Sequence, residues 1–352
     1  MENKKEKIKQ NIFVFLLSSV ILIYFFYGFF TNENAAGAGG YNGDFKLIWQ
    51  NLTLLKEGII VNLNNSNYND SRPPLSYILH ILLNPFIYNV EVFRLSNLLI
   101  SSSVPFLLYL SIKENYSNLD NGLTLLLALT VTLSPYFRTT SFWALGENYG
   151  IIFLLLSYLT YASLKKNLIN FTSLKKFLII FFLCLFSSII VYFDQKLVFI
   201  PFLVLILILS LNIEIKFKIY SIILFVIFSL PYFYLIYLWG SLIPSSANDA
   251  REVGSSIHLY HPGYCLTILV FAIFPFFFMN NVNLETLKNK ILNKNLIYIL
   301  VLFLFYSLLI ISLGDFENLR IEGKGAFHKI SLVLIQNLNV RLIFTIISFL
   351  LS

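Results

Sequence analysis

Long blocks of uncharged, apolar residues decide what this chain can fold into. Residues 12–30 and 219–239 each hold about 20 residues without a charged side chain, the length that an α-helix needs to cross ~30 Å of hydrocarbon. The chain is 57% hydrophobic and only 12% charged, so such blocks occupy most of its 352 residues. We therefore predict an all-α, polytopic transmembrane helix bundle that forms a single integral membrane domain over residues 1–352. The predicted spans are 12–30, 95–112, 122–137, 149–164, 176–193, 197–213, 219–239, 262–279 and 296–313, with a tenth at 331–352.

Basic residues at the ends of these blocks predict the orientation in the membrane. Four lysines lie ahead of the first block, which is longer than the apolar core of a signal peptide and is therefore expected to be retained. Bases outnumber acids in the predicted loops 113–121, 165–175, 214–218 and 280–295 when these loops are taken together. Because cytoplasmic loops are rich in Lys and Arg, the N-terminus and these loops are predicted to be cytoplasmic. Residues 31–94 then form a large first extracytoplasmic loop with interfacial helices, one of them at 75–90, and residues 240–261 form an extracytoplasmic lid loop.

Composition also excludes two classes of partner. The net charge of +7 does not indicate binding to nucleic acid, because the basic residues flank the spans and serve orientation. Cys184 and Cys265 both lie inside apolar runs, and no cluster of His and Cys has the spacing of a metal site. We predict no metal ligands and no nucleic-acid partner.

Two motifs in the first outward loop can carry chemistry. Asp44 follows a glycine-rich run at 37–43, and the apolar residues after it follow a helical period as far as Gly58. Asp44 is thus a candidate catalytic carboxylate, although an acidic residue at this point also serves as a helix cap. The segment Arg72-Pro73-Pro74 holds a guanidinium group on a stiff backbone beside an apolar stretch, where a lipid phosphate would lie.

Other polar motifs fall in the remaining outward loops. Residues 134–149 contain Arg138, Trp143 and Glu147 between two spans, and Glu147 is either a helix-start acid or a second carboxylate that converges on Asp44. Asp194-Gln195-Lys196 forms a tight polar turn, and His258 and His261 lie at the end of the lid loop. Pro262 disfavours metal binding by these two histidines, so we expect one of them to contact a substrate.

The order of these motifs resembles the GT-C class of membrane glycosyltransferases, in which an acidic outer loop and a Pro-Pro segment precede many spans. The resemblance is carried by Gly43-Asp44, Arg72-Pro73-Pro74-Leu75, the loop 134–147 and Asp194-Gln195-Lys196. Within the class, Tyr41-Asn42-Gly43-Asp44 and the histidines at 258–261 look similar to the family that adds the terminal glucose to a dolichol-linked oligosaccharide.

This resemblance implies a reaction and a set of residues. The donor would be a polyprenyl-phosphate sugar, and the acceptor a glycan or a lipid-linked molecule at the extracytoplasmic face. Asp44 would be the general base, with Glu147 as a second catalytic carboxylate. The implied ligands of the donor phosphate are Arg72, Arg138 and Lys196, and the implied substrate contacts are Tyr41, Trp143, Asp194, Gln195, His258 and His261. The class's usual pair of adjacent acids is absent because Phe45 follows Asp44, which leaves a divalent cation open and no cofactor assigned.

Two other functions compete with this one. A flippase or transporter would place ionisable residues in mid-span, whereas the predicted spans here are almost free of them. A polymerase or ligase of lipid-linked glycans would share both the outward site and an arginine for phosphate.

Overall fold

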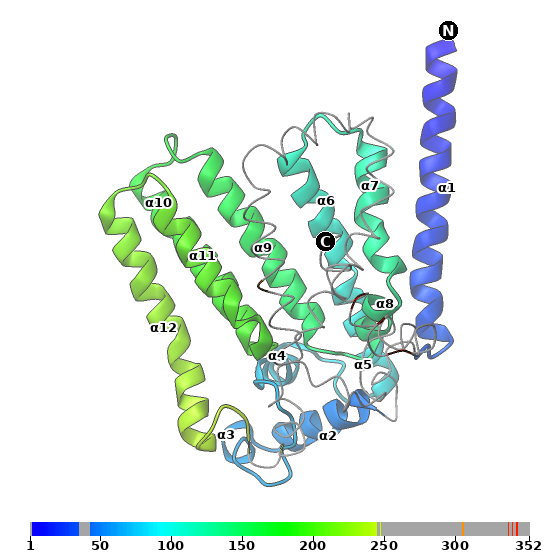
Figure 1. Cartoon of the computed structure of the whole chain (residues 1–352). Coiled ribbons are helices and arrows are strands. Elements are labelled where there is room, and N and C mark those ends of the chain that lie inside the picture. The colour runs from blue at the N-terminus through cyan, green and yellow to red at the C-terminus, as the bar shows by residue number, and fades with distance from the viewer. Residues whose placement is uncertain are drawn as a thin grey trace. The chain divides into compact units, whose positions relative to one another are not determined.

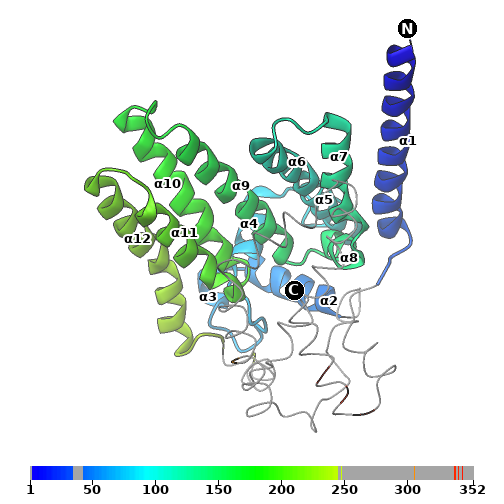
Figure 2. The same ribbon diagram turned by 45° about the horizontal axis from the view of Figure 1, so that its top comes forward.

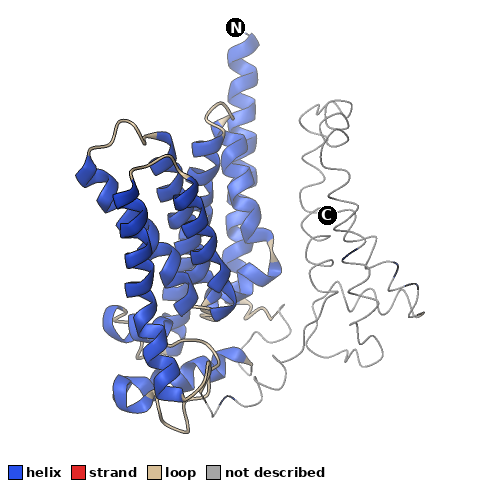
Figure 3. Ribbon diagram, turned by 60° about the vertical axis from the view of Figure 1, so that its left-hand side comes forward, coloured by secondary structure: helices blue, strands red, loops and turns tan. Residues whose placement is uncertain are grey.

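The computed structural model describes residues 2–34 and 43–244, together with isolated positions at 247, 305, 337, 340 and 343. Every regular element in this part of the chain is a helix, which confirms the predicted all-α class there (Figures 1 and 3). The chain divides into two compact units, Met1–Arg251 and Glu252–Ser352, and the first contains nearly all described residues. Its helices are α1 (Glu2–Phe30), α2 (Asp44–Lys56), α3 (Ile59–Asn62), α4 (Leu75–Leu83), α5 (Val90–Ser101), α6 (Ser103–Asn115), α7 (Asn121–Leu129), α8 (Pro135–Phe142), α9 (Glu147–Lys166), α10 (Ser173–Ile189), α11 (Phe199–Ser210) and α12 (Ile215–Trp239).

Four helices in the described part are long and apolar enough to cross a membrane: Asn11–Phe30, Val90–Asn115, Ser173–Tyr192 and Ile215–Trp239. A fifth would be the pair α8 and α9, which meet at an angle of 108°. These helices are consistent with an integral membrane protein. Apart from the isolated positions 305, 337, 340 and 343, the predicted spans 262–279, 296–313 and 331–352 lie outside the described residues, as does nearly all of the predicted lid loop. The count of nine or ten spans therefore stays a prediction.

Two predicted spans are shorter than expected. The block 122–137 forms α7 and a short 3-10 helix that ends at Leu133, because Ser134 caps a new helix whose first residue is Pro135. Proline at that position fits a helix start but not a helix interior. In the block 197–213 the α-helix is limited to α11, the twelve residues Phe199–Ser210, and residues 197 and 198 belong to a preceding 3-10 helix.

The segments that carry the candidate site residues of the first unit collect at one end of its helices. Helices α2, α3, α4 and α8 lie at the end away from the start of α1, whereas the turns after α6, α9 and α11 lie at the other end (Figures 1 and 2). The sequence predicts this separation from the alternation of its apolar blocks. Which end faces the outside of the cell stays a prediction.

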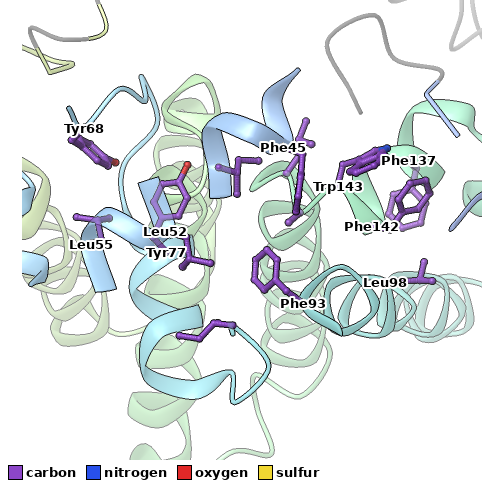
Figure 4. Packing of buried hydrophobic residues seen from close by; sticks show 14 of the residues in the cluster. Phe45, Leu52, Leu55, Tyr68, Tyr77, Phe93, Leu98, Phe137, Phe142 and Trp143 are labelled. Carbon is purple, nitrogen blue, oxygen red and sulfur yellow. The ribbon is translucent and has the colours of Figure 1, made fainter. Parts of the chain in front are cut away.

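The apolar face of α2 fixes these segments to the long helices. Phe45, Ile48, Leu52 and Leu55 follow a helical period and are all buried. They join a hydrophobic cluster with Tyr77 of α4, Phe93 of α5, and Phe142 and Trp143 at the end of α8 (Figure 4). Helix α2, which Asp44 opens, is therefore packed against α4, α5 and the end of α8.

Candidate active site

A network of hydrogen bonds holds the segment before the two prolines. Asp70 is buried, and its Oδ1 accepts the backbone N–H of Arg72 at 2.9 Å, while the hydroxyl of Tyr77 donates to Oδ2. Burial and the Asp70 carboxylate raise the pKa of Tyr77 well above its usual value, which keeps this hydroxyl a donor. The Tyr68 hydroxyl donates to the Arg72 carbonyl at 3.3 Å. The backbone of Arg72 is therefore held in place.

A reciprocal amide pair ties this segment to α2. The Asn51 side chain donates to the Asn69 carbonyl at 3.1 Å and accepts the Asn69 N–H at 3.1 Å. Asn51 is itself buried in α2, the helix that begins with Asp44. The positions of Asp44 and Arg72 are thus coupled through a single helix.

The Arg72 guanidinium pairs with Glu147, the first residue of α9. Its Nη2 lies 3.4 Å from Oε1 of Glu147, and the two side chains are 23% and 19% exposed. Burial opposes the charge on Arg72, but the carboxylates of Asp70, Glu147 and Asp44 outweigh it and raise the pKa of Arg72 above its ordinary value. Arg72 therefore carries a fixed positive charge among carboxylates from three segments.

Asp44 and Asp194 belong to the same group of charges. Asp44 opens α2, with Gly43 rather than Asp44 at the cap position. Asp44, Arg72, Glu147 and Asp194 all act electrostatically on Tyr136, at the start of α8. The structure thus brings together four of the residues singled out in the sequence. We name Asp44, Arg72, Tyr136, Glu147 and Asp194 the charged cluster.

A close backbone contact brings the start of α9 against the turn that contains Asp194. A Cβ added to Gly146 would lie 3.0 Å from the Phe193 carbonyl oxygen, so only glycine fits there without a shift. Asp194 is buried, and Gln195 begins a short 3-10 helix, Gln195–Val198, that also contains Lys196. The Lys196 side chain lies outside the described part of the chain.

Arg138 requires a correction, because in the structure it does not join Arg72. Its Nε donates to Glu33 Oε2 at 2.6 Å and its Nη2 donates to the other oxygen of Glu33. The Arg138 side chain is only 2% exposed. Glu33 thus already occupies the face of Arg138 that was expected to hold a donor phosphate.

Trp143 is also placed differently from the expectation of a substrate contact. It is buried in the hydrophobic cluster, where its ring packs on Phe45 and its Nε1 donates to the Glu33 carbonyl at 2.9 Å. The Arg94 guanidinium lies over the ring at 3.9 Å. In this arrangement Trp143 is a core residue. Tyr41, His258 and His261 lie outside the described residues.

No family model, curated protein or solved structure matches this chain. A carboxylate can take a proton from a hydroxyl group, and a fixed guanidinium beside it can neutralise a phosphate. Within the described ranges, no three His, Cys, Asp or Glu side chains are grouped in a way that would hold a metal ion.

A histidine near the cluster is unsuited to act as the base. His80 of α4 contacts the Tyr149 hydroxyl through Nε2 at 2.8 Å and the Asn84 amide through Nδ1 at 3.1 Å. The Tyr149 hydroxyl donates onward to Asn97. Burial lowers the pKa of His80 to about 4, so the ring is neutral near pH 7 and both nitrogens are engaged.

The sequence analysis missed Asp70, Asn51, Tyr136 and Glu33. Asp70 had one visible signal, since it stands two residues before Arg72, the spacing at which an Asp side chain accepts a backbone N–H. Glu33 had none, because its partner Arg138 is 105 residues away in the chain.

Proposed function

We propose that the protein is a membrane glycosyltransferase that moves a sugar from a polyprenyl-phosphate donor to a hydroxyl group of a glycan or lipid-linked acceptor at the extracytoplasmic face. One observation carries the proposal. The charged cluster gathers at one end of helices that are long and apolar enough to cross a membrane. A donor with a hydrocarbon tail in the bilayer and a sugar phosphate at its surface fits such a site.

The proposed reaction is a single displacement. Asp44 takes the proton from the acceptor hydroxyl, the hydroxyl oxygen forms a bond to the anomeric carbon, and the bond from that carbon to the phosphate oxygen breaks. The electron pair leaves with the phosphate, and the configuration of the sugar inverts.

Arg72 supplies the positive charge for the leaving group in this proposal. Its guanidinium is partly exposed, whereas that of Arg138 is buried and held by Glu33. The interaction between the guanidinium and the phosphate strengthens as negative charge builds on the leaving oxygen. A fixed guanidinium therefore stabilises the transition state of sugar transfer more than the bound donor, which lowers the activation barrier. Since Glu147 now pairs with Arg72, the phosphate has to share or replace that contact.

The test is sugar transfer in proteoliposomes that contain the purified protein. Donors are labelled polyprenyl-phosphate sugars, and the matched controls are the corresponding sugar nucleotides without a lipid. The proposal expects a labelled product from at least one lipid donor and none from the nucleotides. Transfer from nucleotides alone would contradict the proposed donor. Transport of the lipid donor without transfer would favour a flippase, and transfer only from lipid diphosphate glycans would favour a polymerase or ligase.

A further inference from the structure

Two buried oxygen atoms beside the charged cluster have no hydrogen-bond partner among the described residues. They are Oε2 of Glu147 and Oε1 of Gln195. Buried acceptors are almost always satisfied in proteins, and an unsatisfied pair next to a reactive site calls for an explanation. Both atoms need a donor, which a hydroxyl group of a ligand or a water molecule can supply.

The two oxygens belong to segments that meet. Glu147 follows Gly146, whose backbone lies against the Phe193 carbonyl oxygen, and Gln195 stands two residues after Phe193. Tyr149 of the same α9 turn stacks on Phe193, with ring centroids 5.5 Å apart. The start of α9 and the turn at 193–195 are therefore in contact, and Glu147 joins both to Arg72.

The charge on Glu147 favours a neutral donor over a cation. Its Oε1 is already paired with Arg72 at 3.4 Å, so the carboxylate has its counter-charge and only Oε2 lacks a partner. A hydroxyl donates to a carboxylate oxygen in a charge-assisted hydrogen bond without adding a second positive charge. Neighbouring hydroxyl groups of a sugar can serve Glu147 and Gln195 together.

We propose that Glu147 and Gln195 form a subsite for sugar hydroxyl groups, with Glu147 acting in recognition rather than as a base. This inference rests on the proposed transferase function and names two residues that select its sugar. Either the donor sugar or the acceptor sugar supplies these hydroxyls, and analogues of each distinguish the two sources.

The test compares KM and kcat for parent sugars and for deoxy analogues of the donor and of the acceptor. In Glu147→Gln and Gln195→Leu, KM for the parent sugar should rise about tenfold, because the loss of one hydrogen bond weakens binding by about that factor. KM for the analogue that lacks the relevant hydroxyl should be the same in wild type and variant. If the substitution leaves KM unchanged for a deoxy donor, the subsite binds the donor sugar. If it leaves KM unchanged for a deoxy acceptor, the subsite binds the acceptor sugar. Equal fold-changes for parent and all analogues, or a fall in kcat with KM unchanged, would overturn the proposal.

Gln195→Leu separates ligand binding from a structural role. Removing an unsatisfied buried acceptor should leave the thermal stability of the protein unchanged or raised while KM rises. A lower stability with unchanged KM would overturn the subsite.

Failure of the proposed function is recognised separately, because wild type would then transfer no sugar. In that case free methyl glycosides should still raise the melting temperature of wild type but not of either variant. The same shift in all three proteins, or none in any of them, would overturn the subsite.

Discussion

The ion pair between Glu33 and Arg138 gives the sharpest prediction for stability. The Arg138 side chain is 2% exposed and that of Glu33 is 27% exposed, and Nε and Nη2 of Arg138 both donate to the carboxylate. Removing one partner of a buried pair costs about 3–5 kcal/mol, because the remaining charge stays buried without a counter-charge. Since Glu33 is partly exposed, we expect Glu33→Gln to lower the free energy of unfolding by about 3 kcal/mol, at the low end of that range.

An exposed pair provides the matched control. Lys166 and Glu114 lie 3.1 Å apart, with side chains that are 65% and 30% exposed. Such a pair contributes about 0–1 kcal/mol, so Glu114→Gln should change stability little. Both variants are compared by reversible denaturant unfolding in detergent micelles, followed by tryptophan fluorescence.

A double variant tests the cause of the loss. In Glu33→Gln with Arg138→Met, no charge remains buried, so the double variant should be more stable than Glu33→Gln alone. Equal losses in Glu33→Gln and Glu114→Gln, or a double variant less stable than the single one, would refute the reasoning.

Three further predictions concern the surroundings of the charged cluster. Asp70→Asn should lower the free energy of unfolding by about 2 kcal/mol, because Asp70 accepts bonds from the Arg72 N–H and from a tyrosine; denaturant unfolding that matches wild type would contradict this. Gly146→Ala should cost about 1–3 kcal/mol, because its methyl group would meet the Phe193 carbonyl oxygen at 3.0 Å; an unchanged melting temperature would show that this contact is loose. The unfolded chain takes up a proton at His80 near pH 6.5 and the folded chain only near about 4, so stability falls as pH falls through this window. The loss totals about 3 kcal/mol. Unfolding at pH 7 and pH 4.5 should show a smaller drop for His80→Gln than for wild type, and equal drops would rule out this origin.

Much of the fold was predictable because its signals are local. In a membrane, an uncharged block of about 20 residues can satisfy the hydrogen bonds of its backbone N–H and C=O groups by forming a helix. The described part of the chain is helical where such blocks occur. The period of Phe45, Ile48, Leu52 and Leu55 likewise predicts α2. Pro135 could have predicted that the helix in the block 122–137 ends early, because proline fits the start of a helix but not its interior.

The gathering of Asp44, Arg72, Glu147 and Asp194 also follows from a simple rule. Alternating spans bring every second connection to the same end of a bundle, and these four residues lie on such connections. Their roles in a reaction stay predictions.

Pairings between distant residues were not predictable. The sequence offers Arg138 and Trp143 as polar and amphipathic residues in a loop, and nothing local shows that both contact Glu33. Arg138 pairs with Glu33 because the packing of α1 against α8 places the two side chains together. That packing depends on side chains that are far apart in the sequence, so no local pattern predicts the pair. For the same reason Asn51 gave no signal before its partner Asn69 was seen.

In the proposed mechanism, Asp44 deprotonates a sugar acceptor beside Arg72. Its most direct test is the initial rate of sugar transfer in proteoliposomes for wild type, for Asp44→Asn and for Glu57→Gln, an exposed acid at the other end of α2. We expect Asp44→Asn to fold, to unfold like wild type and to transfer sugar at least about 100-fold more slowly, because a general base usually contributes a factor of that size. Glu57→Gln should keep the wild-type rate. A rate for Asp44→Asn equal to that of wild type would contradict the account.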